Sequence, residues 1–406
     1  MQSEFRSHFR PAGLALLAVL AAGTARASDH LDTPSVIADP RADIGDVFAW
    51  TSSDGRKLDL VMTIVGHSFS DRIAYTFHVD SGKLFGRTTS SVEITCRFPT
   101  PDRAECQAGG ADRAQGDARS EAGLKGRNGH FRVFAGLRDD PFFNNVRGTR
   151  AAYEVAQAAI KAGAPVDAAS CPTFDAATVT AIHDAWRGTD GGPARNFLVG
   201  WTPASIVIEV DLGVVNKGGP LLAVWGTTAS GLRQIDRAAR PLTGNALLAT
   251  LGSSEESNRL KEAYNAATPS TAQRFIPEIA KGAALYDGFD GKCGNGLAVD
   301  SRLPLDRRYQ EIAALLADDR LWVDSKSSVC TELFAVERAV VATPILLEQD
   351  CGGRTPTMNA VNVYRSLLVD GSATSLDDGL SRDERPVSPD FPFLAPAEPT
   401  VAGAKS

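Results

Sequence analysis

Residues 28–50 read SDHLDTPSVIADPRADIGDVFAW, and the remainder of the chain is organised around this stretch. It starts as a polar segment and ends in the apolar run 47–50, which predicts the first strand. The polar segment contains five carboxylates, Asp29, Asp32, Asp39, Asp43 and Asp46. Oxygen ligands of this kind suit a hard cation such as Ca²⁺ rather than a soft metal. We therefore expect a cation or small ligand to bind at a site formed by His30, Asp32, Asp39, Asp43 and Asp46 together with Asp140.

The beginning of the chain has the pattern of a secretory signal peptide. Arg6 and Arg10 form a positive n-region, residues 14–22 an apolar h-region, and A-R-A at 25–27 a cleavage signal. The apolar run is too short to cross a bilayer, which takes roughly 20 residues. We expect a signal peptide over residues 1–27 with cleavage after Ala27, a periplasmic or secreted protein, and no transmembrane segment.

The balance of charge argues against one class of partner. The chain has 49 acidic and 42 basic side chains, and removing three arginines and one glutamate with the signal peptide takes the net charge from −7 to −9. An acidic exported protein is a poor nucleic-acid binder and is better suited to cations or neutral ligands. We expect no nucleic-acid partner.

Six cysteines in an exported chain predict disulfides rather than a zinc or redox site, because none of them forms a C-x-x-C pair. Six cysteines allow 15 pairings. Short separations along the chain favour two local bridges and leave one long-range bridge. The favoured set is Cys96–Cys106, Cys330–Cys351 and, by remainder, Cys171–Cys293.

Period-2 alternation of apolar and polar residues predicts strands early in the chain. The runs 58–64, 73–79 and 92–96 alternate in this way, and DG at 54–55 and SG at 81–82 are turn signals. We expect these runs to form an antiparallel meander. Further strand signals follow at 130–137, 205–210 and 221–228. The fold class expected is mainly β with helical insertions (α+β), around an antiparallel β-sandwich-like core.

The stretch 99–129 is rich in Gly, Ala, Asp and Arg, and it has few large apolar residues. We interpret it as a flexible inserted loop, closed at its base by Cys96–Cys106. Together with the acidic segment 28–46 it belongs to a single globular domain over residues 28–396, followed by a disordered tail at 397–406.

Helical spacing of apolar residues appears in the middle and near the end of the chain. Tyr153, Ala156 and Ile160 share one face, and Asp175 is a candidate N-cap for a second helix. Similar spacing at 305–316 and 361–368 predicts a more helical C-terminal third.

Two short runs, RDDPFF at 138–143 and QIDR at 234–237, are the most specific of several motifs that occur in order. The others are the opening stretch, ASIVIEVDL with PLLAVWGTT, and GGRTP through to FPFLAP. Together they resemble the bacterial family catalogued as domain of unknown function 4331. The family has no established activity, so the resemblance implies an exported, β-rich fold and carries over no catalytic residues.

Asp139 and Asp140 follow a predicted strand and lie beside Arg138. Two adjacent carboxylates could ligate a cation or hold one proton between them for acid–base work. The alternative is an Asx-type turn before Pro141, with an aspartate capping the segment that follows. Both interpretations stay open from the sequence.

Asp236 and Arg237 form a second charged pair after an apolar strand. They could position an anion or pair with the acidic N-terminal segment. The structural alternative, a charge-paired strand end, is favoured because ion pairs of this kind also cluster without a functional role.

Cleavage after Ala27 would leave Ser28-Asp29-His30 as the new N-terminus. A free amine with histidine in third position can hold Cu²⁺ or Ni²⁺ in a square plane of nitrogens. The alternative is that His30 is a buried anchor, hydrogen-bonded to Asp32 and Asp43.

Three functions are compatible with these features. The leading one is an exported, disulfide-stabilised protein that binds a cation or small ligand through residues 28–46 and is not a catalyst. The second is a periplasmic hydrolase that uses Asp139 and Asp140 with Arg138. The third is an envelope interaction module that binds a protein partner. Motifs for acyl transfer, nucleotide binding and nicotinamide chemistry are absent from the sequence, which lowers the support for an enzyme.

Overall fold

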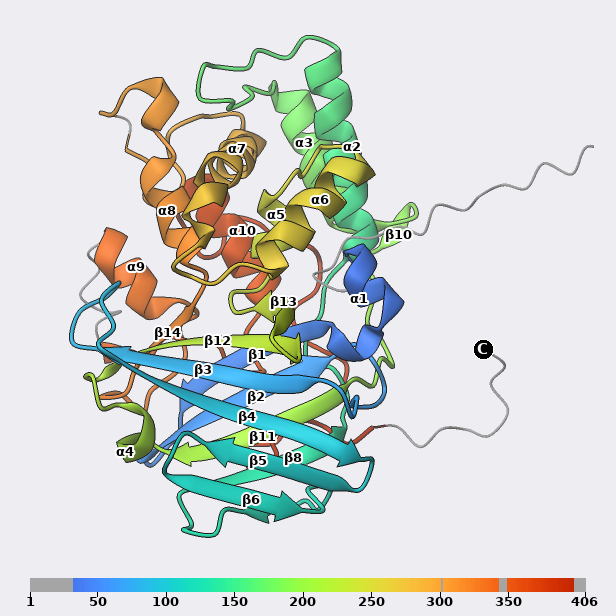
Figure 1. The fold of residues 1–406 in the computed structure, drawn as a ribbon. Helices are drawn as coiled ribbons and strands as arrows, with labels where there is room; N and C mark the ends of the chain where they lie inside the picture. The colour runs from blue at the N-terminus through green and yellow to red at the C-terminus, as the bar shows by residue number, and fades with distance from the viewer. Residues whose placement is uncertain (1–31, 301, 343–348, 398–406) are drawn as a thin grey trace, which may run out of the picture.

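Two antiparallel β-sheets pack face to face below a layer of helices (Figure 1). The structure is a computed structural model, and it describes residues 32–300, 302–342 and 349–397. The expected signal peptide, Asp29, His30 and the tail beyond residue 397 lie outside the described residues. Within the described ranges, no helix has the length and apolar character needed to cross a bilayer.

The first sheet has the spatial order β1 (Ile44–Thr51), β2 (Lys57–Ile64), β11 (Ala204–Asp211), β8 (Phe131–Leu137) and β7 (Leu124–Lys125). The second sheet has the order β13 (Arg233–Ala238), β12 (Leu221–Ser230), β3 (Ala74–Gly82), β4 (Ser90–Thr100), β5 (Arg103–Ala108) and β6 (Asp112–Gly116), and β14 (Leu321–Asp324) also pairs with β12. A small separate ribbon pairs β9 (Gly188–Thr189) with β10 (Gly192–Pro193).

The main core lies between the two sheets. Leu60 and Met62 of β2 and Phe77 and Val79 of β3 belong to one buried cluster, and each is at most 1% exposed. Alternation within each strand aims every second side chain into this core, as the period-2 pattern predicts. The expected antiparallel, β-sandwich-like α+β fold is confirmed.

The expected meander is wrong in one respect. The turn at 54–55 does join β1 to β2 as a hairpin, but β2 pairs next with β11 and not with β3. The chain crosses from the first sheet to the second after β2, and β3 pairs with β4 and β12. Alternation gives the same signal for consecutive strands of one sheet and for strands in two facing sheets, so it does not distinguish the two arrangements.

The stretch 99–129 is not a loop. It contains β5 and β6, which extend the second sheet, and β7 at the edge of the first. Its inward positions are small residues, Ala104, Cys106, Ala108 and Ala114, each at most 3% exposed. The alternation is therefore present, but small side chains give it a weak hydropathy signal.

The helices are α1 (Pro34–Ala38), α2 (Val146–Lys161), α3 (Ala176–Trp186), α4 (Leu212–Val215), α5 (Thr243–Leu247), α6 (Ser254–Asn265), α7 (Ile276–Asp287), α8 (Gln310–Asp318), α9 (Ala335–Ala342) and α10 (Ala360–Asp370). Short 3₁₀ helices lie at η1 (Pro40–Ala42), η2 (Ala272–Phe275), η3 (Gly288–Asp290) and η4 (Leu305–Arg307). Asp175 caps α3 as expected, since its carboxylate accepts a hydrogen bond from the Thr178 backbone N–H at 2.8 Å. Most helices gather on one side of the sandwich, at the top of Figure 1.

All three disulfides pair as the short separations predict. Cys96–Cys106 joins directly opposite residues of β4 and β5. Cys330–Cys351 closes a span of 21 residues, and Cys171–Cys293 connects positions 122 residues apart.

Candidate functional site

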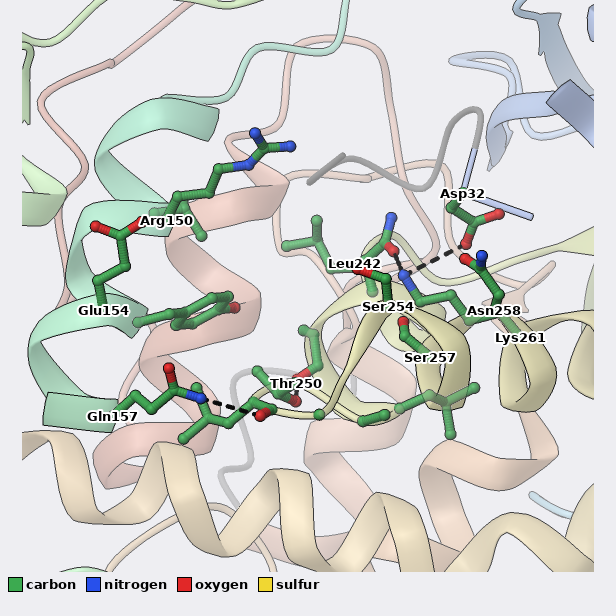
Figure 2. A pocket seen from close by; sticks show the side chains of 18 of the residues that line it. Asp32, Arg150, Glu154, Gln157, Leu242, Thr250, Ser254, Ser257, Asn258 and Lys261 are labelled. Atoms are coloured by element: carbon green, nitrogen blue, oxygen red, sulfur yellow. Dashed lines mark hydrogen bonds and ion pairs between the residues drawn. The ribbon is translucent and has the colours of Figure 1, made fainter. Parts of the chain in front are cut away.

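A cavity of about 720 Å³ lies in the helical layer, between α2 on one side and α5 and α6 on the other (Figure 2). One residue of the acidic segment, Asp32, reaches its wall, and one residue of α10, Arg365, also lines it. The remaining lining residues are Thr149, Arg150, Tyr153, Glu154, Gln157, Leu242, Asn245, Ala246, Leu248, Ala249, Thr250, Leu251, Gly252, Ser254, Ser257, Asn258 and Lys261.

The α2 wall is formed by Arg150, Tyr153, Glu154 and Gln157, whose spacing of three and four residues places them on one face of the helix. The helix begins at Asn145, whose side chain accepts a hydrogen bond from the Gly148 backbone N–H at 3.1 Å. Figure 2 shows the Arg150 side chain extending from α2, while Gln157 donates to the Leu251 carbonyl at 3.2 Å.

The opposite wall is a polar stripe along α6. Ser254, Ser257, Asn258 and Lys261 lie at positions i, i+3, i+4 and i+7 and therefore share a face. Lys261 is 9% exposed. Its ammonium donates to the side-chain oxygen of Asn245 and lies 3.6 Å from an Asp32 carboxylate oxygen (Figure 2).

Arg365 is the most buried cation of the cavity, with 3% of its surface exposed. Its guanidinium carbon lies 5.6 Å from the centre of the Trp186 ring, and the phenols of Tyr153 and Tyr286 lie near it. Its Nε and Nη1 atoms are buried and have no hydrogen-bond partner within the described part of the chain. These two nitrogens have lost their hydration without gaining a hydrogen bond, while the charge of the group is offset by the nearby Asp378 carboxylate.

Burial acts on two other lining groups. It raises the pKa of Tyr153 well above its usual value, so the phenol stays neutral and can donate or accept a hydrogen bond. It lowers the pKa of Arg150, although guanidinium groups stay charged in proteins. One nitrogen of Arg150, Nη2, is buried without a hydrogen-bond partner among the described residues.

The carboxylates of the acidic segment point to different neighbours. Asp39 caps η1 and contacts the Arg41 side chain at 2.8 Å. Asp43 is buried, at 1% exposed, and Asp46 pairs with the buried guanidinium of Arg354. Within the described ranges, no group of three His, Cys, Asp or Glu side chains is arranged to hold a metal ion. The calcium site thus stays a prediction without a donor set there, and the Cu²⁺ site at Ser28-Asp29-His30 lies outside the described residues.

Asp140 does lie near Asp46, as the cation hypothesis requires, but Arg354 is near both of them. Burial raises the pKa of Asp140 well above its usual value, and the charge of Asp46 raises it further. One Asp140 oxygen accepts a hydrogen bond from the Phe142 backbone N–H at 3.1 Å, across Pro141. This contact is the Asx-type turn of the structural alternative.

The three candidate catalytic residues diverge. Arg138 contacts Glu121 at 2.7 Å, Asp139 lies 3.8 Å from the Arg385 guanidinium, and Asp140 faces the interior. Their exposed fractions are only 3%, 5% and 3%. The Asp139 and Asp140 carboxylates therefore have separate partners, and a substrate has little access to either.

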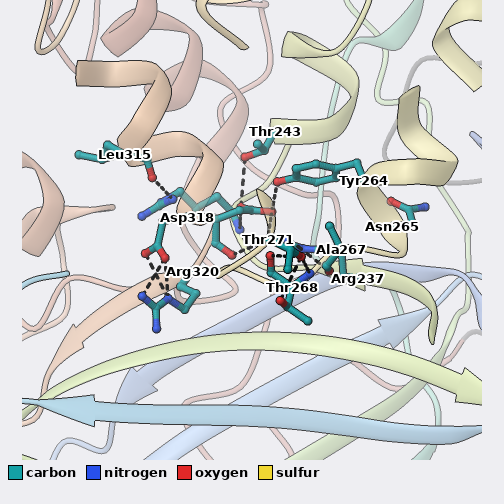
Figure 3. A network of polar contacts seen from close by, with 12 residues as sticks. Arg237, Thr243, Tyr264, Asn265, Ala267, Thr268, Thr271, Leu315, Asp318 and Arg320 are labelled. Atoms are coloured by element: carbon teal, nitrogen blue, oxygen red, sulfur yellow. Dashed lines mark hydrogen bonds and ion pairs between the residues drawn. The ribbon is translucent and has the colours of Figure 1, made fainter. Parts of the chain in front are cut away.

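Asp236 and Arg237 both have structural contacts. Asp236 accepts a hydrogen bond from the Ile44 backbone N–H at 2.8 Å, which ties β13 to the acidic segment. Arg237 lies 4.7 Å from the centre of the Tyr264 ring and 3.5 Å from an Asp319 carboxylate oxygen. Figure 3 shows it within a network of polar contacts that also contains Thr243 and Tyr264.

The residues of the cavity were not anticipated, apart from Asp32. Arg150, Lys261 and Arg365 belong to three different helices, and sequence alone does not place them together. The one signal in the sequence is the polar stripe of α6, which is indistinguishable from an ordinary solvated helix face.

No protein-family model, curated protein or solved structure matches the chain. The resemblance to the domain of unknown function 4331 family stays a prediction that rests on the motifs quoted above.

Proposed function

We propose that this is an exported binding protein for a small polar organic ligand, which it holds in the cavity between α2 and α5–α6. The observation that carries the proposal is the cavity itself. Its volume of about 720 Å³ falls within the range of roughly 300–1,000 Å³ typical of small-molecule sites. Charged and hydroxyl side chains from α2, α6 and α10 converge on it, and convergent polar groups are what orient a ligand.

Two further features support this function over hydrolysis at Asp139 and Asp140. Those carboxylates are buried and separately partnered, whereas the cavity offers open space lined by hydroxyl, amide and charged side chains. Export is supported by the signal-peptide pattern and by three disulfides, which persist in oxidising compartments.

The test is a thermal unfolding screen of the mature chain against amino acids, sugars, sugar alcohols and small carboxylic acids. A ligand that binds only the folded state raises the melting temperature in a concentration-dependent way. Ser257→Trp should block the cavity and abolish the effect. Arg259→Trp is the matched control, because Arg259 is on the same helix, exposed and outside the cavity lining.

Two outcomes would reject the function. One is a screen in which no compound of the panel shifts the melting temperature. The other is a compound that stabilises the Ser257→Trp variant as much as the wild type, which would place its site elsewhere.

A further inference from the structure

We infer that the ligand of this cavity is a neutral polyhydroxy compound, a sugar or a sugar alcohol. The inference rests on the proposed function and names its ligand class. It stands on a contrast within the lining. Each charged side chain has an opposite charge near it, whereas a row of hydroxyl and amide groups on α6 has no hydrogen-bond partner within the described part of the chain.

Two pairs of opposite charge lie within the lining itself. The Lys261 ammonium is 3.6 Å from an Asp32 carboxylate oxygen. Glu154 stands at position i+4 from Arg150 on α2, which places the two side chains on one face of the helix. The charge of Glu154 acts on the Arg150 guanidinium. Each of these four groups therefore already has a counter-charge from the protein.

Arg365 is the remaining charged group, and Asp378 offsets its charge from outside the lining. The lining cations are thus balanced by carboxylates of the chain. An anionic or cationic ligand would lose its hydration without finding an uncommitted counter-charge, and a zwitterion would have to compete with pairs that already exist. Burial of a charge without a partner costs free energy, so this lining favours a neutral ligand.

The uncharged polar groups along α6 are in the opposite situation. Ser254, Ser257 and Asn258 lie on the stripe that lines the cavity, and none of their side chains has a hydrogen bond to another described residue (Figure 2). Hydroxyl and amide groups both donate and accept. A compound with several hydroxyls offers them partners of the same character and adds no charge.

Apolar side chains supply the other kind of contact that a sugar needs. Leu242, Leu248 and Leu251 line the cavity, and Tyr153 adds its ring on the α2 side. The C–H faces of a sugar can pack on such groups while its hydroxyls meet α6. Small-molecule sites commonly combine apolar contact area with a few placed polar groups in this way.

Calorimetry with probes that share one skeleton tests the preference for a neutral ligand. The probes are glucose, galactose and mannose, each with its uronic acid and its 2-amino derivative, measured at mildly acidic pH so that the amine is charged. We expect at least one neutral sugar to bind, and its two charged derivatives to bind at least about tenfold more weakly, because the added charge finds no free partner. The affinity of the neutral sugar should change by less than about twofold between ionic strengths of about 0.1 M and 1 M, since salt screens charges only.

Variants on α6 connect binding to the unpartnered groups. Ser257→Ala removes a hydroxyl and Asn258→Ala removes an amide, and each should weaken the neutral sugar by about 2- to 10-fold, the equivalent of one hydrogen bond. Arg259→Ala is the control, because Arg259 is on the same helix, exposed and outside the lining. Thermal unfolding of each variant without ligand checks that it is folded.

A charge variant should reverse the preference. Asp32→Asn removes the carboxylate that offsets Lys261 and leaves one positive charge of the cavity without its partner. The affinity of the uronic acid should then rise by about tenfold or more relative to that of the neutral sugar, which a mere loss of packing would not produce. Glu255→Gln is the control, because Glu255 is on α6, exposed and outside the lining, and it should leave this ratio unchanged.

The outcomes separate this inference from the function on which it rests. Charged derivatives that bind as tightly as the neutral sugar, binding unaffected by both Ser257→Ala and Asn258→Ala, or an unchanged preference in Asp32→Asn overturns the neutral-ligand assignment and leaves a polar-ligand site in place. No binding by any sugar also overturns the assignment, and the wider thermal screen, with its amino acids and carboxylic acids, then decides the proposed function separately.

Discussion

At the scale of single residues, Asp59 has the clearest consequence for stability. It lies on β2 between Trp50 of β1 and Glu209 of β11, and it is 2% exposed. Burial, and then the charge of Glu209, raise its pKa to about 8, although Lys57 and Arg132 act in the opposite direction. In the unfolded chain the pKa of aspartate is about 4. Between these two values the folded protein holds a proton that the unfolded chain has lost.

The free energy of unfolding should therefore fall as the pH rises from about 4 to about 8. Above about pH 8 the Asp59 carboxyl is ionised in both states and should cause no further decrease. Asp59→Asn removes the titrating carboxyl. The free energy of unfolding of this variant should therefore change less with pH, and near pH 8 the variant should be more stable than the wild type. Urea unfolding across this pH range measures both effects. Asp117→Asn is the control: the pKa of that exposed carboxyl is lowered to about 2 by Arg119, so the slope should not change. A slope in Asp59→Asn equal to that of the wild type would contradict the assignment.

At the scale of elements, the three disulfides should differ in their contributions because they close loops of different length. Cys171–Cys293 spans 122 residues and Cys96–Cys106 spans 10. On a chain-entropy model the long bridge stabilises by roughly 5 kcal/mol and the short one by roughly 3 kcal/mol. Replacing each pair by alanine and comparing urea midpoints tests the order. A larger loss for the Cys96/Cys106 double variant would show that contacts in the β4–β5 hairpin outweigh loop closure.

The elements that could be predicted from the sequence are those whose signal is local. Asp175 as an N-cap and the turn at 54–55 each act within a few residues, and each is found as expected. The strands β5 and β6 were missed, because alanine and cysteine at their inward positions resemble a loop in composition.

Of the residues that line the cavity, only Asp32 could be predicted from the sequence as part of a site. It belongs to the acidic segment, whose density of carboxylates predicts a site, and it does line the cavity. Arg150 and Arg365 are separated by more than half of the chain, and each alone looks like an ordinary helical arginine. Tertiary packing brings them to one cavity, and no pattern within a single helix encodes that.

At the scale of the whole molecule, the acidic segment links the sandwich to the helical layer. The Ser35 backbone N–H and hydroxyl donate to the Glu262 carboxylate of α6 at 2.6 and 3.0 Å, and the Ile44 backbone N–H donates to Asp236. Asp46 pairs with Arg354 from the other end of the chain. Three of the carboxylates that suggested a cation site, Asp32, Asp39 and Asp46, thus contact cationic side chains of the protein itself.

The outer face of the first sheet is covered by the segment 388–396, which we call the C-terminal strap. The rings of Phe393 and Trp50 meet edge to face with centres 4.9 Å apart. The centre of the Phe391 ring lies 4.2 Å from the guanidinium carbon of Arg132. The strap is anchored by the Asp139 backbone N–H, which donates to the Ala395 carbonyl at 3.0 Å. Beneath it lies a separate apolar cluster, formed with Phe48, Val61, Phe134 and Val207.

This arrangement predicts that the strap contributes to stability as a part of the core does. Phe393 is only 7% exposed, so Phe393→Ala should lower the free energy of unfolding by about 3–5 kcal/mol. Deleting residues 388–406 should have a larger effect and should also uncover the apolar cluster on the sheet, which a hydrophobic fluorescent dye would detect. Leu232→Ala is the control, because Leu232 is fully exposed and should be neutral. If the deletion variant unfolds at the wild-type urea concentration and binds no dye, the strap is a loose surface segment and the first sheet does not need it.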